Sequence, residues 1–584
     1  MTIFVVITIT LLLGKIVCMV FNKLPTDVLG LLIVAITLVT TTLTTEDALS
    51  CFSSSSVVLV GVLCVLVGGL IHSGVLQWVA RNMLGTPRNY HGALLRLIMP
   101  ASFLSAFVSN LAVVQLLISV VKIWGKRLHI APSKLLIPLS YASTLGGLCT
   151  LIGNAPNLVV AEFYTGQTGQ SMGIFAPLVP GLFCLLVGIL VMLMLRNLIP
   201  TRRSPEESFE KSSDYTLELL VPTDCAHVGE SVEEAGLYHV NGGQLIEIVR
   251  FDREVISPVP RDEFILGGDR LIYSGQINAV LELRESHGLV NATHHVFKVS
   301  EIDRNRKLQT ASVDVGSPLC GHAMADLTFE DDNNVVLVAI AREGERLNVS
   351  PREVVLRSGD TLLLEGSKLR PEHFVDNLNF FDHIPLPQSG RKTLISSLIM
   401  IGMVLLSTTG VMPLLNSCFL AAIIMGIAHC FSVEQLQRSI NWKLMMVFAG
   451  SVCLGRAIDS TGIADFLASR LLSVSGTSPL LTLSLIAFAA TFVTEFISNT
   501  TAAAVFAPIA LHAAQTLNVD PMPFIISLML AVSCSFATPV GSETNTLVYG
   551  PGGYKFFDYF KIGLCMNFAL LAANIFIVTM VYDF

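Results

Sequence analysis

The stretch TEFISNTTAAAV, residues 494–505, places a carboxylate, a serine, an amide and three threonines in a strongly apolar part of the chain. It also has a counterpart, because FLSAFVSNLAVVQL (103–116) matches FVTEFISNTTAAAV (492–505) at an offset of 389 residues. A second pair, TLIGNAPNLVV (150–160) and TPVGSETNTLV (538–548), matches at an offset of 388 residues. Similarity at a nearly constant offset is typical of an internal repeat. We therefore predict two homologous halves.

Composition places both halves in a membrane. The chain of 584 residues is 52% hydrophobic and only 14% charged, and its mean hydropathy is +0.67. Several apolar stretches approach the roughly 20 residues that a helix needs to cross a bilayer. The charge is concentrated in residues 201–390, which hold 32 of the 44 acidic and 18 of the 36 basic residues. The sequence thus predicts a polytopic α-helical membrane protein that is interrupted by an acidic, soluble insert.

Each half is predicted to contain five spans and one re-entrant hairpin that carries the Ser-Asn pair. The first half covers residues 1–200 with its hairpin at 97–122, and the second covers 391–584 with its hairpin at 479–512. Because five crossings is an odd number, the second half would be inverted relative to the first. The predicted spans are 2–20, 26–44, 56–74, 135–165 and 174–199, then 393–410, 412–431, 443–460, 523–549 and 560–582.

The distribution of basic residues predicts the orientation. Lysine and arginine are enriched in cytoplasmic loops, and the loops 45–55, 166–173 and 513–522 contain neither. We therefore expect these three loops and both termini outside, with the insert 201–390 in the cytoplasm. The expected location is a bacterial inner membrane.

The polar cluster would be unfavourable against lipid, where an unpaired polar group has no partner. At the tip of a hairpin, the hydroxyl and amide oxygens could hold a cation, and the donors could hold an anion. The alternative role is to join packed helices, but the recurrence of Ser-Asn in both halves favours a binding site. In GGLCTLIGNAPN (146–157) and SFATPVGSETN (535–545), Gly, Pro and Asn predict helix breaks. Broken helices expose amides to anions and carbonyls to cations.

These motifs resemble those of the divalent anion:sodium symporter family, also called the sodium/sulfate and carboxylate symporters. SNLAVVQL (109–116) and SNTTAAAVFAPIA (498–510) are similar to the paired SNT hairpin motifs of that family. IGNAPN (152–157) and PVGSETNTLVYGPGGY (539–554) are similar to its paired helix breaks. The resemblance covers both membrane halves. It implies a homodimer in which the transport domain of each protomer moves like an elevator and carries an anion together with sodium.

The resemblance also implies where the ions would lie. One sodium site is implied at Ser105, Ser109, Asn110 and Gly153. A second is implied at Thr494, Ile497 (through its backbone), Asn499 and Gly541. The anion would lie between the two hairpin tips, in contact with Asn110, Ser498, Asn499 and Thr500. Supporting roles fall to Asn157, Asn545, Glu495 and Glu543.

The match to the family motifs is incomplete. Leu111 stands where the first SNT motif has threonine, and Asn154-Ala155 and Ser542-Glu543-Thr544 replace its Thr-Pro-Pro pattern. Glu543 would repel an anion when charged, but when protonated it could couple a proton instead of sodium. Pairing with a backbone amide at the helix break is the alternative role for Glu543. Glu495, one helical turn before the Ser-Asn pair, is expected to anchor the hairpin through hydrogen bonds.

The insert contains a repeat of its own. The first copy, 205–285, includes GDRLIYSG (268–275), and the second, 296–370, includes GDTLLLEG (359–366). In both, a turn precedes a half-buried strand. The copies resemble tandem RCK C-terminal (TrkA-C) domains, which implies an α+β insert. Two roles stay open, namely dimerisation and the binding of a cytosolic nucleotide.

We therefore expect a sodium-coupled symporter that imports a small divalent anion, with sulfate favoured, and that uses neither an organic cofactor nor nucleic acid. The alternative is a di- or tricarboxylate or other oxyanion carrier, driven by protons through Glu543. The insert also suggests an RCK-regulated potassium channel, but the chain has no TVGYG-type filter. An enzyme is not expected, because no nucleophile and base stand at a recognisable spacing. His72 and His512 are expected to pack near span ends.

Overall fold

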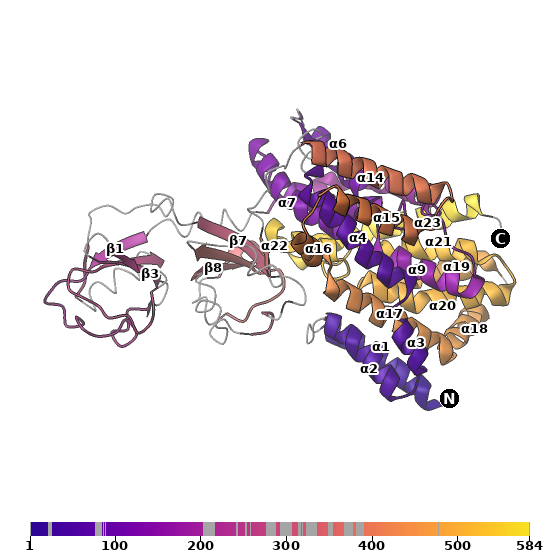
Figure 1. Ribbon diagram of the computed structural model, residues 1–584, viewed down its shortest axis with the longest axis horizontal. Helices are drawn as coiled ribbons and strands as arrows, with labels where there is room; N and C mark the ends of the chain where they lie inside the picture. Colours follow the sequence, from indigo (N-terminus) through magenta and orange to yellow (C-terminus); the bar gives the residue numbers. More distant parts are fainter. Residues whose placement is uncertain are drawn as a thin grey trace. The chain divides into compact units, whose positions relative to one another are not determined.

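The computed structural model divides into a helical unit and a β-rich unit (Figure 1). The helical unit consists of Met1–Thr201, Ile384–Val548 and Lys555–Phe584, and the β-rich unit of Arg202–His383 and Tyr549–Tyr554. The structure describes residues 2–20, 26–75, 84–85, 87, 89–202, 216–240, 243–250, 254–256, 259–275, 288–291, 307–313, 317, 319–322, 336–347, 354–366, 378–380, 390–476 and 478–582.

The first part of the helical unit consists of apolar helices, two pairs of which are separated by short interruptions. One interruption, at residues 106–109, separates α6 from α7, and another, at 148–154, separates α8 from α9. The elements are α1 (Thr2–Val20), α2 (Thr26–Val39), α3 (Thr45–Ser50), α4 (Ser55–His72), α6 (Tyr90–Ser105), α7 (Asn110–Arg127), α8 (Ser133–Gly147), α9 (Ala155–Thr168), α10 (Leu178–Met194) and the 3-10 helix η1 (Leu195–Leu198).

The second part shows the same kind of interruptions, at residues 494–498 and 534–542. The first of these separates α19 from α20, and the second separates α21 from α22. The elements are α14 (Gly390–Thr408), α15 (Leu414–Ile427), α16 (Val433–Ser439), α17 (Trp442–Ser460), α18 (Ile463–Ser475), α19 (Pro479–Val493), α20 (Asn499–Leu517), α21 (Pro521–Ser533), α22 (Glu543–Gly552) and α23 (Phe556–Val581).

The predicted breaks within spans 135–165 and 523–549 are confirmed, and both Ser-Asn pairs lie where one helix ends and the next begins. The short helices α3, α16 and α18 were not predicted. The sequence does contain a start signal for α3, because the hydroxyl of Thr44 accepts a hydrogen bond from the backbone N–H of Asp47 at 3.1 Å. For α16, Ser432 and Gln435 form a capping box. With 6 and 7 residues, α3 and α16 are too short to show a hydrophobic period.

The helical unit is that of a polytopic membrane protein. Four of the described helical segments are long and apolar enough to cross a bilayer, namely Thr45–His72, Leu178–Leu198, Gly390–Thr408 and Phe556–Val581. On α10, the exposed side chains Val179, Leu182, Leu186 and Leu190 recur at helical spacing. They form one apolar face that suits contact with lipid.

Two glycines let α2 and α17 approach closely. A Cβ atom added at Gly450 would lie 2.5 Å from the backbone oxygen of Gly30. One added at Gly30 would lie 2.5 Å from the backbone oxygen of Met446. Small residues are the usual means by which helix backbones come into contact in a membrane.

Gly450→Ala is therefore expected to lower the thermal stability of the purified protein, because overpacking costs about 1–3 kcal/mol. Gly402→Ala, in α14, is the matched control, since a Cβ there meets nothing within 4 Å. The measurement is the melting temperature of each variant in detergent. Equal melting temperatures for the two variants would contradict the close packing.

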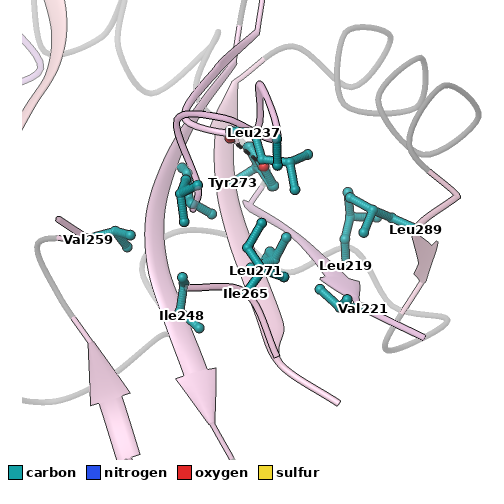
Figure 2. Packing of buried hydrophobic residues seen from close by; sticks show 12 residues of the cluster. Leu219, Val221, Leu237, Ile248, Val259, Ile265, Leu271, Tyr273 and Leu289 are labelled. Carbon is teal, nitrogen blue, oxygen red and sulfur yellow. Dashed lines mark hydrogen bonds between the residues drawn. The ribbon is translucent and has the colours of Figure 1, made fainter. Parts of the chain in front are cut away.

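The first sheet of the β-rich unit is antiparallel and has the strand order β2-β3-β5-β1-β6, with β4 paired to β3. Its buried core includes Leu219, Ile248 and Leu271, which lie together in Figure 2. The hydroxyl of buried Tyr273 donates 2.6 Å to the Leu237 carbonyl oxygen. The strands are β1 (Thr216–Leu220), β2 (His239–Val240), β3 (Gly243–Arg250), β4 (Glu254–Ile256), β5 (Arg270–Gly275) and β6 (Val290–Asn291).

The second sheet has the order β11-β7-β10-β8-β9. Strands β7, β10 and β8 pair in the same way as β1, β5 and β3 of the first sheet. Through β6 and β11, the two sheets reach past the sequence limits 205–285 and 296–370. The strands are β7 (Lys307–Val313), β8 (Val336–Arg342), β9 (Glu345–Arg346), β10 (Thr361–Gly366) and β11 (Leu378–Phe380).

Each sheet contains the same buried ion pair. Arg250 donates to both carboxylate oxygens of Asp269 at 3.1 and 3.0 Å, and Arg342 donates to those of Asp360 at 2.8 and 2.7 Å. The bond to Asp269 raises the pKa of Arg250 above its usual value. Both aspartates also accept a backbone N–H from the preceding turn. The Gly-Asp motif therefore fixes the turn before the last long strand of each copy.

Asp269→Ala is expected to destabilise the first sheet by about 3–5 kcal/mol, because it leaves a largely buried arginine without its main partner. Glu233→Ala is the control, since Glu233 and Arg261 form an exposed pair at 3.1 Å, worth about 1 kcal/mol or less. Limited proteolysis of the full chain, read as the rate of cleavage within 216–291, should rise for the aspartate variant alone. Equal rates for the wild type and Asp269→Ala would contradict this role.

Candidate functional site

The first interruption gathers oxygen atoms around the side chain of Asn110. One end of its amide lies 2.5 Å from Ser105 Oγ, 2.8 Å from the Gly153 carbonyl oxygen and 3.2 Å from that of Ser143. Carbonyl oxygens only accept, so hydrogen bonding places the amide nitrogen at this end. With the amide oxygen there instead, the group would consist of oxygens alone, which is the set of atoms that broken membrane helices offer to sodium.

The second interruption gathers a similar group around Asn499. Thr494 Oγ1 lies 2.8 Å from Asn499 Oδ1 and 2.9 Å from the Val532 carbonyl oxygen. Ser535 Oγ donates to the same amide oxygen at 3.1 Å. Thr494 and Ser535 are fully buried. Both hairpin asparagines thus lie among oxygen atoms from their own tip and from a neighbouring segment.

A threonine ties each broken span to the nearby hairpin tip. Thr150 Oγ1 donates to the Ala106 carbonyl oxygen and accepts from Gly153 N–H at 3.1 Å. In the second half, Thr538 Oγ1 donates 2.8 Å to the Glu495 carbonyl oxygen and accepts from Gly541 N–H at 3.0 Å. The hydrogen bonds of one half are therefore repeated in the other.

The supporting asparagines brace these loops. Asn157 Nδ2 donates 2.9 Å to the Thr150 carbonyl oxygen, and Asn545 Nδ2 donates 3.1 Å to that of Thr538. Both asparagines are fully buried. Each amide therefore closes the loop that carries the glycine.

The loop glycines lie against the tips. A Cβ atom at Gly153 would lie 2.5 Å from the Ser105 carbonyl oxygen and 3.1 Å from that of Ala106. A Cβ atom at Gly541 would lie 2.9 Å from the Thr494 carbonyl oxygen. The absence of a side chain therefore lets the backbone of each loop reach the hairpin.

Glu495 links the second tip to two further segments. One of its carboxylate oxygens accepts from the Ala537 N–H at 3.0 Å and from Asn567 Nδ2, on α23, at 2.5 Å. The side chain is 7% exposed. These contacts agree with the expected anchoring role.

The other predicted residues lie at the two tips or, for Glu543, at the second break, and all lie outside these two groups. Ser109 is exposed and caps α7, where its Oγ accepts from Ala112 N–H at 3.4 Å. Ser498 caps α20, and its Oγ lies 2.7 Å from Thr501 Oγ1 and 3.2 Å from Thr500 Oγ1. Ile497 is buried at the second tip. Glu543 is exposed in the first turn of α22, where a helix N-terminus favours negative charge.

Direct hydrogen bonds bring the two breaks together. Asn154 Nδ2 donates 2.7 Å to Ser533 Oγ, and the hydroxyl of Tyr141 donates 2.7 Å to the Phe536 carbonyl oxygen. Four helices, α7, α9, α20 and α22, therefore begin around one region of the helical unit. Their first N–H groups and dipoles favour an anion there.

Several residues of this region were not predicted from the sequence. Ser143 and Ser535 approach the hairpin asparagines from neighbouring segments, and Thr150 and Thr538 hold the loops. The repeat could have indicated the two threonines, because they are separated by the same 388 residues as the loop glycines. The two serines have no counterpart at that offset, so only the tertiary structure reveals them.

The chain is similar to known membrane transporters. The family model described as citrate transporter (CitMHS) matches residues 16–469 and 419–583. An uncharacterized transporter of Synechocystis sp. is 27% identical over 599 residues, covering 99% of this chain and 97% of the relative. Sodium/sulfate cotransporter 1 of Chlamydomonas reinhardtii is 22% identical over 713 residues, covering 85% and 80%. The sodium-dependent dicarboxylate transporter SdcS of Staphylococcus saprophyticus is 28% identical over 148 residues, covering 25% and 28%.

The family match extends over nearly the whole chain, including both interrupted regions. It confirms an integral membrane transporter and leaves no support for an enzyme. The chain belongs to the citrate transporter family and is a secondary anion transporter.

Proposed function

We propose that the protein is a sodium-coupled symporter that imports a small divalent anion, with sulfate as its substrate. The observation that carries this proposal is the pair of oxygen groups around Asn110 and Asn499. Two such groups, each with an amide, a hydroxyl and nearby backbone carbonyls, suit two sodium ions. The relatives named as sodium/sulfate cotransporters support the same ion and substrate.

The anion would lie between the tips, bound by Asn110, Ser498, Asn499 and Thr500. These side chains are neutral donors, and a divalent anion held by neutral groups in a low-dielectric site is costly without nearby positive charge. Two sodium ions at the adjoining oxygen groups would supply that charge. The affinity for the anion would then rise only after the cations bind, which couples the two fluxes.

The proposed architecture is two inverted repeats that work as an elevator in a homodimer. The repeated hydrogen bonds of Thr150 and Thr538 support the two homologous halves. The sequence pattern supports five spans and one hairpin in each half, with both termini outside and the insert in the cytoplasm. The dimer and the elevator motion rest on the family resemblance.

For the β-rich unit, we propose two TrkA-C-like domains that dimerise or bind a cytosolic nucleotide. The common strand pairing and the matching Arg250–Asp269 and Arg342–Asp360 pairs support two copies of one domain. Calorimetry of the full-length protein with candidate cyclic dinucleotides tests the ligand role. Absence of heat at high nucleotide concentration would leave dimerisation as the role.

A di- or tricarboxylate carrier is the second candidate, favoured by the description of the matching family as citrate transporter. In such a carrier, a proton bound by Glu543 would replace one of the two sodium ions as the coupling ion. Glu543 is exposed at the start of α22.

Uptake of labelled sulfate into proteoliposomes separates the two candidates. For a sodium-coupled sulfate symporter, we expect labelled sulfate to accumulate under an inward sodium gradient. Unlabelled molybdate should compete with it, and succinate or citrate should compete little. Strong competition by carboxylates would move the substrate to the second candidate. Uptake driven only by a proton gradient would contradict sodium coupling.

A further inference from the structure

One turn of α8 contacts both halves of the candidate site. Ser140, Ser143 and Thr144 stand at positions i, i+3 and i+4, so they share one face of the helix. All three side chains are buried, with 0 to 2% exposure. The sequence motifs gave no role to any of them.

Ser143 faces the first oxygen group. Its Oγ donates to Ser105 Oγ at 3.0 Å and lies 3.1 Å from the Asn110 carbonyl oxygen. A displacement of the first tip would therefore change the hydrogen bonds of Ser143 directly and could shift this turn of α8.

Ser140 and Thr144 face the second break. Ser140 Oγ lies 2.7 Å from Asn545 Oδ1 and 3.0 Å from Thr544 Oγ1. Thr144 Oγ1 lies 3.3 Å from the same threonine hydroxyl. The first half thus contributes two hydroxyls to the start of α22, directly after the loop that carries Ser535.

From Asn545 the contacts lead to the second tip. Asn545 Nδ2 donates 2.9 Å to the carbonyl oxygen of Ser535, and Ser535 Oγ donates 3.1 Å to Asn499 Oδ1. Hydrogen bonds of Ser143 on one side and of Ser140 on the other, joined by the backbone of one turn of α8, therefore connect Asn110 to Asn499. All the intermediate residues are buried, where an unsatisfied partner is costly.

Within the described residues, the contact of Ser140 with Asn545 is not repeated at the corresponding position of the other half. Leu528 stands at the offset of 388 residues from Ser140, and among the described residues Asn157 Oδ1 has no hydrogen-bond partner. Ser140 is therefore an addition to the repeated pattern, placed where it orients Asn545, one of the two asparagines that brace the loops.

From this geometry we infer that Ser140 is a positioning residue that couples the two cation sites, so that a cation at the first site raises the affinity of the second. The inference rests on the proposed function. It adds the path of the coupling, which passes through Ser140 and one turn of α8. Ser140 itself touches neither ion.

The test is the cation dependence of anion uptake by the full-length protein in proteoliposomes, with Ser140→Ala compared with the wild type. We expect a sigmoidal sodium curve for the wild type. For Ser140→Ala we expect a half-saturating sodium concentration that is roughly three- to tenfold higher, from one lost buried hydrogen bond, with a lower Hill coefficient and a similar maximal rate. Thr144→Val, which keeps the shape of threonine, should show a smaller shift in the same direction.

Ser102→Ala is the matched control, because Ser102 is also a buried serine but donates to a backbone carbonyl, that of Ala142, at 2.9 Å. Its sodium curve should equal that of the wild type. An unchanged sodium curve for Ser140→Ala, a non-sigmoidal wild-type curve, or a loss of maximal rate without a shift would overturn the inference. If protons instead of sodium drive uptake by the wild type, the proposed coupling ion is wrong. The role of Ser140 is then tested by comparing the proton dependence of uptake in the wild type and Ser140→Ala.

Discussion

Asn499→Ala is expected to reduce cation-driven anion uptake by at least about 100-fold, because it removes the amide oxygen shared by Thr494 and Ser535. Two buried hydroxyls would each lose a partner, at about 1–3 kcal/mol each, and every 1.4 kcal/mol is a factor of ten in affinity. The change also removes a proposed contact to the anion. Initial uptake rates at saturating sodium measure the loss.

Gln515→Ala is the control for Asn499→Ala. Gln515 lies on the same helix, α20, and pairs with Gln167 at 3.3 Å through an exposed side chain. Its uptake rate should match that of the wild type. Near-normal uptake by Asn499→Ala would show that the second oxygen group is structural.

Gly153→Ala is the second change with a large expected effect. Its Cβ atom would lie 2.5 Å from the Ser105 carbonyl oxygen and 2.8 Å from Gly147 Cα, so the loop and the first tip must separate. Oxygen atoms that converge on Asn110 would then move apart by a few tenths of an ångström or more. We expect loss of sodium-stimulated uptake while the protein still folds, as measured by its elution from a size-exclusion column.

Gly166→Ala provides the comparison for Gly153→Ala. Gly166 is a glycine of α9, the helix that follows the same loop, and a Cβ there meets nothing within 4 Å. Replacing a helical glycine at such a position should leave uptake unchanged and should not lower stability. Equal uptake by the two variants would contradict the close approach of the loop to the tip.

The sequence was most informative where polar and helix-breaking residues interrupt apolar runs. Ser-Asn at 109–110 and 498–499 marks both hairpin tips, and the glycine and proline motifs mark both breaks. These features are local, because helix propensity and the cost of burying polar groups in lipid act on short segments. The same reasoning found Asn110 and Asn499 themselves.

Two partners of those asparagines were not predicted. Ser143 comes from α8, outside any quoted motif, and Ser535 opens the second helix break, where its contact with Asn499 has no local signal. Which serine of an apolar helix faces a hairpin depends on how the helices pack. Ser140 shows the same limit, since its contact with Asn545 spans 405 residues of sequence.

In the proposed mechanism, the two tips form one anion site that depends on sodium. Equilibrium binding of labelled sulfate to the purified protein, with and without sodium, tests it most directly in the wild type, Asn110→Ala and Asn499→Ala. We expect saturable binding that requires sodium and is lost in both variants. Sodium-independent binding, or full binding by either variant, would contradict it.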